Sequence, residues 1–160
     1  MKKILFLFIL LSSLAFGITD FPSLNWGMNP KTVEIFYPNL KKEVSIYPNT
    51  KQFSKVYSNS QISKTVFYFI NDELFKIDVY YDKNEIRGND VKNIFSKLKD
   101  KFGNPVSKEP IYEKLGNITL TGNKITFNGG KDTSVAFKGV DTNSKGKLID
   151  SNLILEYMAK

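Results

Sequence analysis

The hydrophobic pattern of the chain is clearest between residues 64 and 103, where two strand-like runs precede a helix-like one. Thr65–Ile70 and Leu74–Tyr81 are rich in β-branched and aromatic residues, and both have a usual strand length of about six to eight residues. Asn71 and Asp72 lie between them, and both residue types tolerate the positive φ of a tight turn. The pattern therefore predicts a β-hairpin in the middle of the chain.

The turn also predicts how the two strands pair. A two-residue turn places three pairs opposite each other: Ile70 with Glu73, Tyr68 with Phe75, and Val66 with Ile77. One face then gathers the apolar side chains of Val66, Tyr68, Ile70, Phe75, Ile77 and Val79. The other face mixes Phe67, Phe69 and Leu74 with Lys76 and Asp78. Since a slip by one residue mixes the two faces, burial is expected to hold this register.

The segment after the hairpin has a helical period. Apolar residues recur at i, i+3, i+4, i+7 and i+11, a spacing that forms one stripe from Val91, Ile94, Phe95, Leu98 and Phe102. Asn89 or Asp90 can cap the start of this helix, and Gly103 followed by Pro105 ends it. An aromatic stripe of this kind is more typical of a packed core than of a ligand site.

Shorter elements lie on both sides of this unit. Asn29 can cap a helix over Pro30–Tyr37, which Pro38 ends. Short strands are expected at residues 44–46, 53–57, 118–120, 124–127, 133–138 and 152–158, with Gly122-Asn123 as a turn. Because neighbouring strands are joined by short turns, the order predicts the α+β class, with an antiparallel sheet of about five to seven strands and two main helices packed on one side.

Residues 1–17 follow the pattern of a secretory signal peptide. A positively charged start precedes the unbroken apolar run Ile4–Leu11, and small residues allow cleavage after Ala15 or after Gly17. The run is shorter than the roughly 20 residues of a membrane-spanning helix, although an uncleaved anchor is the alternative. The pattern predicts an exported protein, periplasmic or secreted, in which residues 18–160 form a single α+β domain.

Composition excludes several classes of function. The chain has no cysteine and no histidine, so it lacks disulfides, thiolate zinc sites, a lipidation cysteine, the commonest general base and the commonest metal ligand. The formal net charge is +7, but Arg87 is the only arginine, and bidentate recognition of phosphates and bases depends on arginine. The lysine excess indicates either a solvated surface or weak, salt-sensitive polyanion contact, and no sequence-specific nucleic-acid recognition.

One polar segment resembles a calcium loop of the EF-hand type. Asp141–Asn152 has oxygen ligands at its first and third positions and Gly146 where the loop turns. Lys145 takes the place of the fifth-position acid, and Asn152 replaces the bidentate glutamate at the twelfth position. The alternative is a polar connection between two strands.

Other candidate chemistry carries no motif. Asp78, Asp82 and Glu85 offer carboxylates near the end of the hairpin, and paired carboxylates hydrolyse glycosidic bonds at suitable separations. Solvated acids at a strand end are the alternative. Trp26, the only tryptophan, is expected to pack beneath the first helix, with a sugar-stacking platform as the alternative. The pattern assigns no catalytic, cofactor-binding or metal-binding residue and implies no cofactor.

Two stretches resemble small exported proteins of the bacterial envelope. They are the run Trp26-Gly27-Met28-Asn29-Pro30-Lys31-Thr32-Val33, and the hairpin and helix that end in Gly103-Asn104-Pro105. The Gly-Met helix start is similar to SmpA/OmlA (BamE-like) outer-membrane assembly modules and to β-lactamase-inhibitor-like modules, over residues 26–38 and 64–105. The resemblance implies an envelope module without shared catalytic residues, and this chain departs from the BamE-like pattern by lacking the lipidation cysteine.

These observations favour a non-enzymatic binding or scaffolding module of the bacterial envelope with a protein partner. One alternative is a small envelope glycan-binding module or a hydrolase that uses Asp or Glu as acid and base. Another is weak binding of anionic glycans or lipid headgroups through lysines. No transmembrane helix is expected after removal of the signal peptide.

Overall fold

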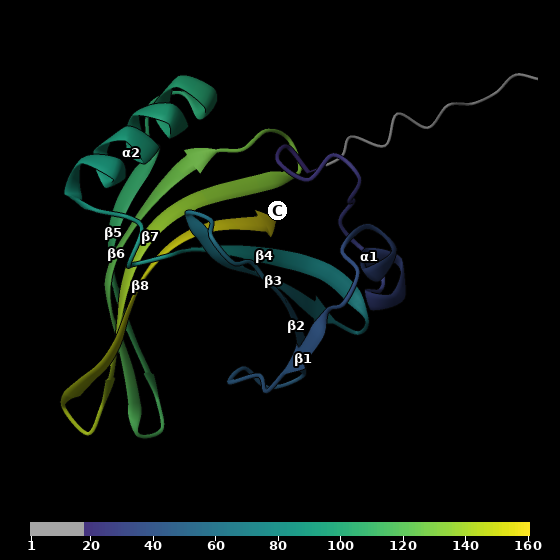
Figure 1. Ribbon diagram of the computed structural model, residues 1–160, viewed down its shortest axis with the longest axis horizontal. Helices are drawn as coiled ribbons and strands as arrows, with labels where there is room; N and C mark the ends of the chain where they lie inside the picture. The colour runs from purple at the N-terminus through teal and green to yellow at the C-terminus, as the bar shows by residue number, and fades with distance from the viewer. Residues whose placement is uncertain (1–17) are drawn as a thin grey trace, which may run out of the picture.

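Eight strands form one antiparallel sheet in the order β1-β2-β3-β4-β8-β7-β6-β5 (Figure 1). The computed structural model describes residues 18–160, and the expected signal peptide at 1–17 lies outside the described residues. The elements are α1 (Pro30–Phe36), β1 (Lys41–Glu43), β2 (Thr50–Val56), β3 (Ile62–Ile70), β4 (Glu73–Tyr81), α2 (Gly88–Phe102), β5 (Ser107–Leu115), β6 (Ile118–Asn128), β7 (Thr133–Ser144) and β8 (Lys147–Ala159).

The expected α+β class, with five to seven strands and two main helices, is wrong. Strands take up 52% of the structure and helices only 15%, so the fold is dominated by its eight-stranded sheet. Strand β5 was missed because its sequence shows no apolar run: Pro110 and charged residues occupy it, and none of its side chains is buried. Its nine residues are in strand form because they pair with β6 through the backbone.

Glycine explains a second error in the strand count. Gly122-Asn123, expected as a turn, lies inside the continuous strand β6. A Cβ added to Gly122 would lie 1.9 Å from the carbonyl oxygen of Gly139 on β7, so the residue permits a close approach of two backbones. The same residue type serves turns and close contacts, and the sequence pattern alone does not separate the two.

The central hairpin forms at the expected place but in a different register. Asn71 and Asp72 both have positive φ, and Ile70 lies opposite Glu73 as expected. Beyond the first pairs a β-bulge intervenes, and Lys76, instead of Phe75, lies opposite Tyr68. The expected pairs Tyr68–Phe75 and Val66–Ile77 are therefore wrong.

The bulge decides which side chains share a face. Phe75, the extra residue, places its ring 6.5 Å from that of Tyr68, on the same side as the next side chain, Lys76. One face of the hairpin therefore carries Phe67, Phe69, Leu74, Ile77 and Val79. The other carries Val66, Tyr68, Lys76, Asp78 and Tyr80. The two sets expected from the sequence are mixed because one extra residue shifts every later side chain on β4 to the opposite face.

The first of these faces holds the hydrophobic core. Helices α1 and α2 and the segment before α1 cover it, and the core includes Val33 of α1, Leu98 of α2 and Phe21 of the leading segment. The predicted stripe of α2 is confirmed, since Val91, Ile94, Phe95 and Phe102 pack against this core. Within residues 18–160 neither helix is both long and apolar enough to span a membrane.

Trp26 belongs to the core side as well. Its ring packs against the core, and its Nε1–H donates a hydrogen bond to Thr133 Oγ1 at 3.0 Å. A partly buried indole with a satisfied donor is a packing residue. The geometry does not favour the alternative of an open sugar platform at this position.

Candidate ligand-binding hollow

The second face of the sheet surrounds a cavity of about 250 Å³. Side chains from both ends of the sheet line it, with Tyr47 from the β1–β2 connection and Glu113 from the edge strand β5. Residues from opposite edges of an eight-stranded sheet can surround one cavity only if the sheet curls around it, and the strands are strongly bent in Figure 1. We call this cavity the hollow; it includes Tyr47, Tyr68, Tyr80, Lys76, Asp78 and Lys138.

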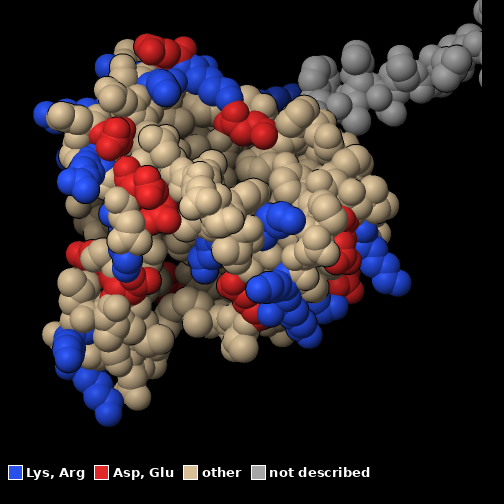
Figure 2. All heavy atoms as spheres, viewed as in Figure 1, with Lys and Arg blue, Asp and Glu red and all other residues tan. Residues whose placement is uncertain are grey.

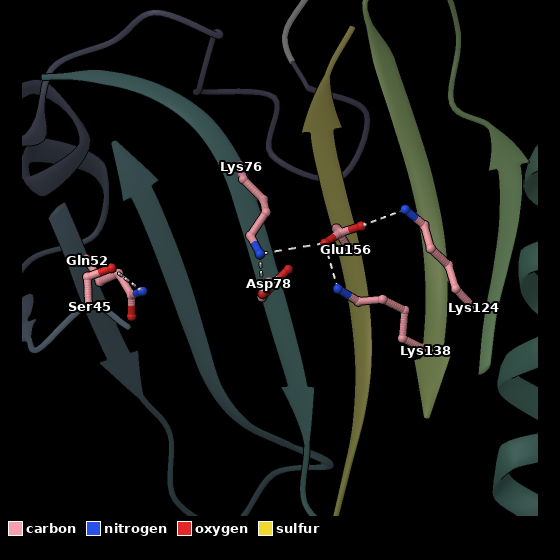
Figure 3. Close-up of polar contacts among 7 residues, drawn as sticks. All are labelled: Ser45, Gln52, Lys76, Asp78, Lys124, Lys138 and Glu156. Atoms are coloured by element: carbon pink, nitrogen blue, oxygen red, sulfur yellow. Dashed lines mark hydrogen bonds and ion pairs between the residues drawn. The ribbon is translucent and has the colours of Figure 1, made fainter. Parts of the chain in front are cut away.

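Five charged side chains cross the middle strands on this face, and we call them the ionic row: Lys76, Asp78, Lys124, Lys138 and Glu156. Figure 3 shows them side by side on β4, β8, β7 and β6. The carboxylate of Glu156 is the centre, with Lys138 Nζ at 2.6 Å, Lys124 Nζ at 3.4 Å and Lys76 Nζ at 3.6 Å. Lys76 Nζ also lies 3.1 Å from Asp78 Oδ2.

The strand register explains why these charges depend on one another. Asp78 is directly opposite Glu156, and Lys124 is directly opposite Lys138, so each cross-strand pair alone would repel. Lys76 lies between the two acids and Glu156 between the two lysines, which converts the repulsion into attraction. The row is therefore stable only as a complete set.

Burial makes the row costly for the fold. The side chains of Asp78 and Glu156 are only 3% and 8% exposed. Removing paired charges from water commonly costs as much as their attraction returns, so apolar residues of similar size would serve folding at least as well. The row therefore adds little to folding stability beyond what apolar residues would give at the same positions.

Glu156 is an anion at neutral pH. Burial raises the pKa of its carboxyl, but the charges of Lys138, Lys76 and Lys124 outweigh burial and hold the pKa below its ordinary value of 4.5. A carboxyl with a lowered pKa, held by three ammonium groups, is a poor proton donor. Glu156 is therefore suited to positioning lysines in the hollow.

Asp78 has one oxygen atom that is not satisfied. Oδ2 pairs with Lys76, while Oδ1 is buried without a hydrogen-bond partner among the described residues. A buried acceptor without a donor costs about 1–3 kcal/mol. Asp78 lines the hollow, so an N–H or O–H group of a ligand in the hollow would remove this cost.

Tyrosine rings surround the lysines of the hollow. Lys76 Nζ lies 4.1 Å from the centre of the Tyr68 ring, and Lys64 Nζ lies 4.7 Å from that of Tyr80. Burial first, and then the charge of Asp78, raises the pKa of the Tyr68 and Tyr80 phenols. Both phenols thus keep their protons beside the carboxyl group of Asp78.

The β1–β2 connection brings a further tyrosine to the rim. Gln52 Nε2 donates to Ser45 Oγ at 3.0 Å, and Ser45 Oγ accepts from the backbone N–H of Tyr47 at 3.1 Å (Figure 3 shows the first pair). Burial and then the charge of Glu113 raise the pKa of the Tyr47 phenol, and both residues line the hollow from opposite edges of the sheet. This connection therefore acts as one wall of the site.

The carboxylates singled out from the sequence do not form one site. Asp78 lies within β4 in the hollow, whereas Asp82 lies after β4, where its Oδ1 accepts the N–H of Asn84 at 2.8 Å. The acid that Asp78 meets is Glu156, which the sequence analysis missed. Its signal was the one charge within the otherwise apolar run Leu153–Met158, which is comparable to the charges of Lys76 and Asp78 between the apolar residues of β4.

The calcium-loop resemblance of Asp141–Asn152 does not correspond to a loop. Its residues extend β7 and β8, and Lys145-Gly146 is the tight turn between them. The Asp141 carboxylate accepts a hydrogen bond from Ser151 Oγ at 2.5 Å, and Asp150 pairs with Lys83. In the described part of the chain no group of three or more Asp or Glu side chains is placed to hold a metal ion.

The fold and the hollow together define a class of protein, a curled antiparallel sheet with a helix-covered core on one face and a polar cavity on the other. The TP0088 domain matches residues 31–137, more than half of the 160-residue chain, and the chain belongs to this family. The match includes Lys76, Asp78 and Lys124. No curated protein and no solved structure matches the chain. The SmpA/OmlA resemblance is not tested by these findings and stays a prediction.

Proposed function

We propose that this TP0088-domain protein is an exported, non-enzymatic binding protein whose hollow takes a small, hydroxyl-rich ligand such as a saccharide unit. The observation that carries the proposal is Asp78, a carboxylate that lines the hollow and whose buried Oδ1 has no hydrogen-bond partner among residues 18–160. Binding sites place a few polar groups of this kind within a largely preformed pocket.

Charge balance favours a ligand without a large net charge. Three lysines line the hollow, Lys64, Lys76 and Lys138, and so do three acids, Glu43, Asp78 and Glu113. Such a lining offers donors and acceptors in equal measure, and the tyrosine rings suit the C–H faces of a sugar ring. A cavity of about 250 Å³ is slightly smaller than the usual range for ligand sites, roughly 300–1,000 Å³, and so suits a small ligand. These features support the glycan-binding alternative among the sequence-based hypotheses.

The same geometry supports binding over glycoside hydrolysis. A hydrolase of that type needs one carboxylic acid with a raised pKa beside a carboxylate. Glu156 has a lowered pKa, and Lys76 pairs with both Glu156 and Asp78. Glu156 is thus held as an anion, which does not suit the role of the proton donor.

A protein partner is a second proposal, and one observation favours it. Tyr112 on the edge strand β5 is 75% exposed, and exposed tyrosines are frequent contact residues of interfaces. Pro110 in the same strand lacks an N–H, which discourages addition of a further strand. The partner would therefore meet side chains of β5. A Tyr112→Ala variant that still captures the partner in crosslinking of native cells would contradict this second proposal.

Calorimetric titration tests the first proposal. The protein is titrated with glucose, N-acetylglucosamine and their short oligomers, and with glucuronic acid and glucosamine as charged comparisons. We expect binding of a neutral sugar, weakened at least about tenfold by Asp78→Asn, because hydrogen bonds to charged groups contribute about 1.5–3 kcal/mol. Tyr47→Ala at the rim should weaken it as well, and Asp82→Asn, outside the hollow, is the matched control.

Absence of heat with every neutral sugar, or equal affinity in the Asp78→Asn and wild-type proteins, would overturn the proposal. Tyr47→Ala keeps the test decisive if Asp78→Asn fails to fold, since Tyr47 is only half-buried at the rim.

A further inference from the structure

Two hairpins extend beyond the rest of the sheet. Strand β8 pairs with β4 only over Ile154–Met158, so its earlier residues have β7 as their neighbour and reach past β4. The β5–β6 hairpin runs beside them, and the N–H of Lys145 at one turn donates to the carbonyl of Asn117 at the other at 3.3 Å. The two turns thus form one projection, visible at the lower left of Figure 1.

The end of this projection is both basic and apolar. We call it the hairpin tip and define it by Lys114, Lys145, Lys147, Leu148 and Ile149, all of which are exposed. Leu148 and Ile149 are 55% and 57% exposed, although both are aliphatic. In Figure 2 this projection ends in blue and tan atoms, and the red carboxylates lie further up.

No acid neutralises the hairpin tip. Neither 114–118 nor 144–149 contains Asp or Glu, and the nearby Asp150 is paired with Lys83 at 2.9 Å. Within residues 18–160 no ion pair involves any of the three tip lysines. Three ammonium groups beside two exposed aliphatic side chains are therefore complementary to an anionic surface with an apolar interior.

We propose that the hairpin tip docks end-on into the surface of an anionic lipid bilayer. Ile149 is the extra residue of a β-bulge, since Leu148 lies opposite Asn143 and Asp150 lies opposite Thr142. End-on entry of the tip brings Leu148 and Ile149 to the membrane together with Lys145 and Lys147. The lysines then reach the headgroups while their aliphatic stems stay along the hairpin. Backbone pairing of β5 with β6, of β6 with β7 and of β7 with β8 holds the tip in place before contact. The entropic cost of docking is therefore small.

Charge and hydrophobicity make separate contributions to this contact. Each lysine near an anionic bilayer surface strengthens binding about fivefold, and added salt weakens this contribution. Burial of Leu148 and Ile149 is insensitive to salt and adds to the same affinity. The docking site is distinct from the hollow, so it stands whether or not a saccharide binds there.

Sedimentation with vesicles tests the inference. The protein is mixed with vesicles of phosphatidylcholine alone and with vesicles that also contain phosphatidylglycerol. We expect binding only to the mixed vesicles, weakened about 25-fold by Lys145→Gln with Lys147→Gln. Leu148→Ser with Ile149→Ser should weaken it at least about tenfold.

Matched variants elsewhere on the surface distinguish binding through the hairpin tip from attraction by the overall positive charge. Lys41→Gln with Lys42→Gln removes the same charge from strand β1, and Ile35→Ser with Val44→Ser removes two exposed aliphatic side chains. Both should bind as the wild type does. Equal weakening by these controls, equal binding to both vesicle types, or no binding at all would overturn the proposal.

Discussion

The two faces of the sheet bury their side chains in different ways, although the same strands build both. On β4, Ile77 and Val79 face the helices, while Lys76 and Asp78 face the hollow. The helix-covered face is largely apolar, whereas the other face holds a buried ionic row beside an open cavity. Folding stability therefore comes mainly from the first face, while the second face loses stability by burying charges and hydrogen-bonding groups.

The largest expected effect on stability comes from a substitution in the apolar core. Phe67 is fully buried, and its ring lies 5.0 Å from that of Tyr37 and 6.4 Å from that of Phe21. Phe67→Ala should lower the free energy of unfolding by about 3–5 kcal/mol, since the cavity left behind cannot close. Urea unfolding followed by circular dichroism measures it, with the half-exposed Phe36→Ala as control; similar losses in both variants would contradict the assignment of the core.

The next largest effect on stability is expected from a substitution in the ionic row. Glu156→Gln removes the shared anion and leaves three lysines close together, which should cost about 3 kcal/mol of unfolding free energy. Adding Lys138→Met to Glu156→Gln should restore part of the loss, because one unpaired cation is then absent. Urea unfolding of both variants checks the coupling, and strictly additive losses would show that the row does not act as a unit.

Lowering the pH should distinguish the contributions of the two faces to folding stability without any substitution. The folded pKa of Glu156 is lowered, so its contribution to stability is present above the unfolded value near 4.5 and is lost as the pH falls below it. The wild type should therefore lose stability below about pH 4.5 more steeply than Glu156→Gln, as thermal unfolding at a series of pH values would show.

Asp150 provides the control for this pH effect. Its pKa is also lowered, first by a hydrogen bond from Asn152 and then by Lys83, but its half-exposed carboxylate takes no part in the ionic row. Asp150→Asn should keep most of the acid sensitivity. A Glu156→Gln profile parallel to that of the wild type would refute the assigned role of Glu156.

The smallest expected effect concerns the polar contact of Trp26 on the apolar face. Thr133→Val removes the acceptor of the Trp26 Nε1–H while keeping the volume. The variant should lose about 1 kcal/mol of unfolding free energy, the usual contribution of one hydrogen bond. Tryptophan emission during urea unfolding measures this loss. An unchanged midpoint would mean that water accepts the Trp26 hydrogen bond in place of the Thr133 hydroxyl.

Part of the candidate site was within reach of the sequence. A charged residue between apolar residues of a strand, as at Lys76, Asp78 and Glu156, marks a position that needs a partner. The identity of the partner was not within reach, because Asp78 and Glu156 lie on strands far apart in the chain and become neighbours only through the pairing of β4 with β8.

The sequence by itself determined the elements whose signals are local: the stripe of α2, the Asn71-Asp72 turn and the capped start of α1. Tertiary structure decided the rest. Backbone pairing made β5 a strand without an apolar pattern, and a single bulged residue on β4 chose which side chains face the hollow. The reason is physical: helical periods and turn propensities act over a few residues, whereas strand pairing and register depend on partners elsewhere in the chain.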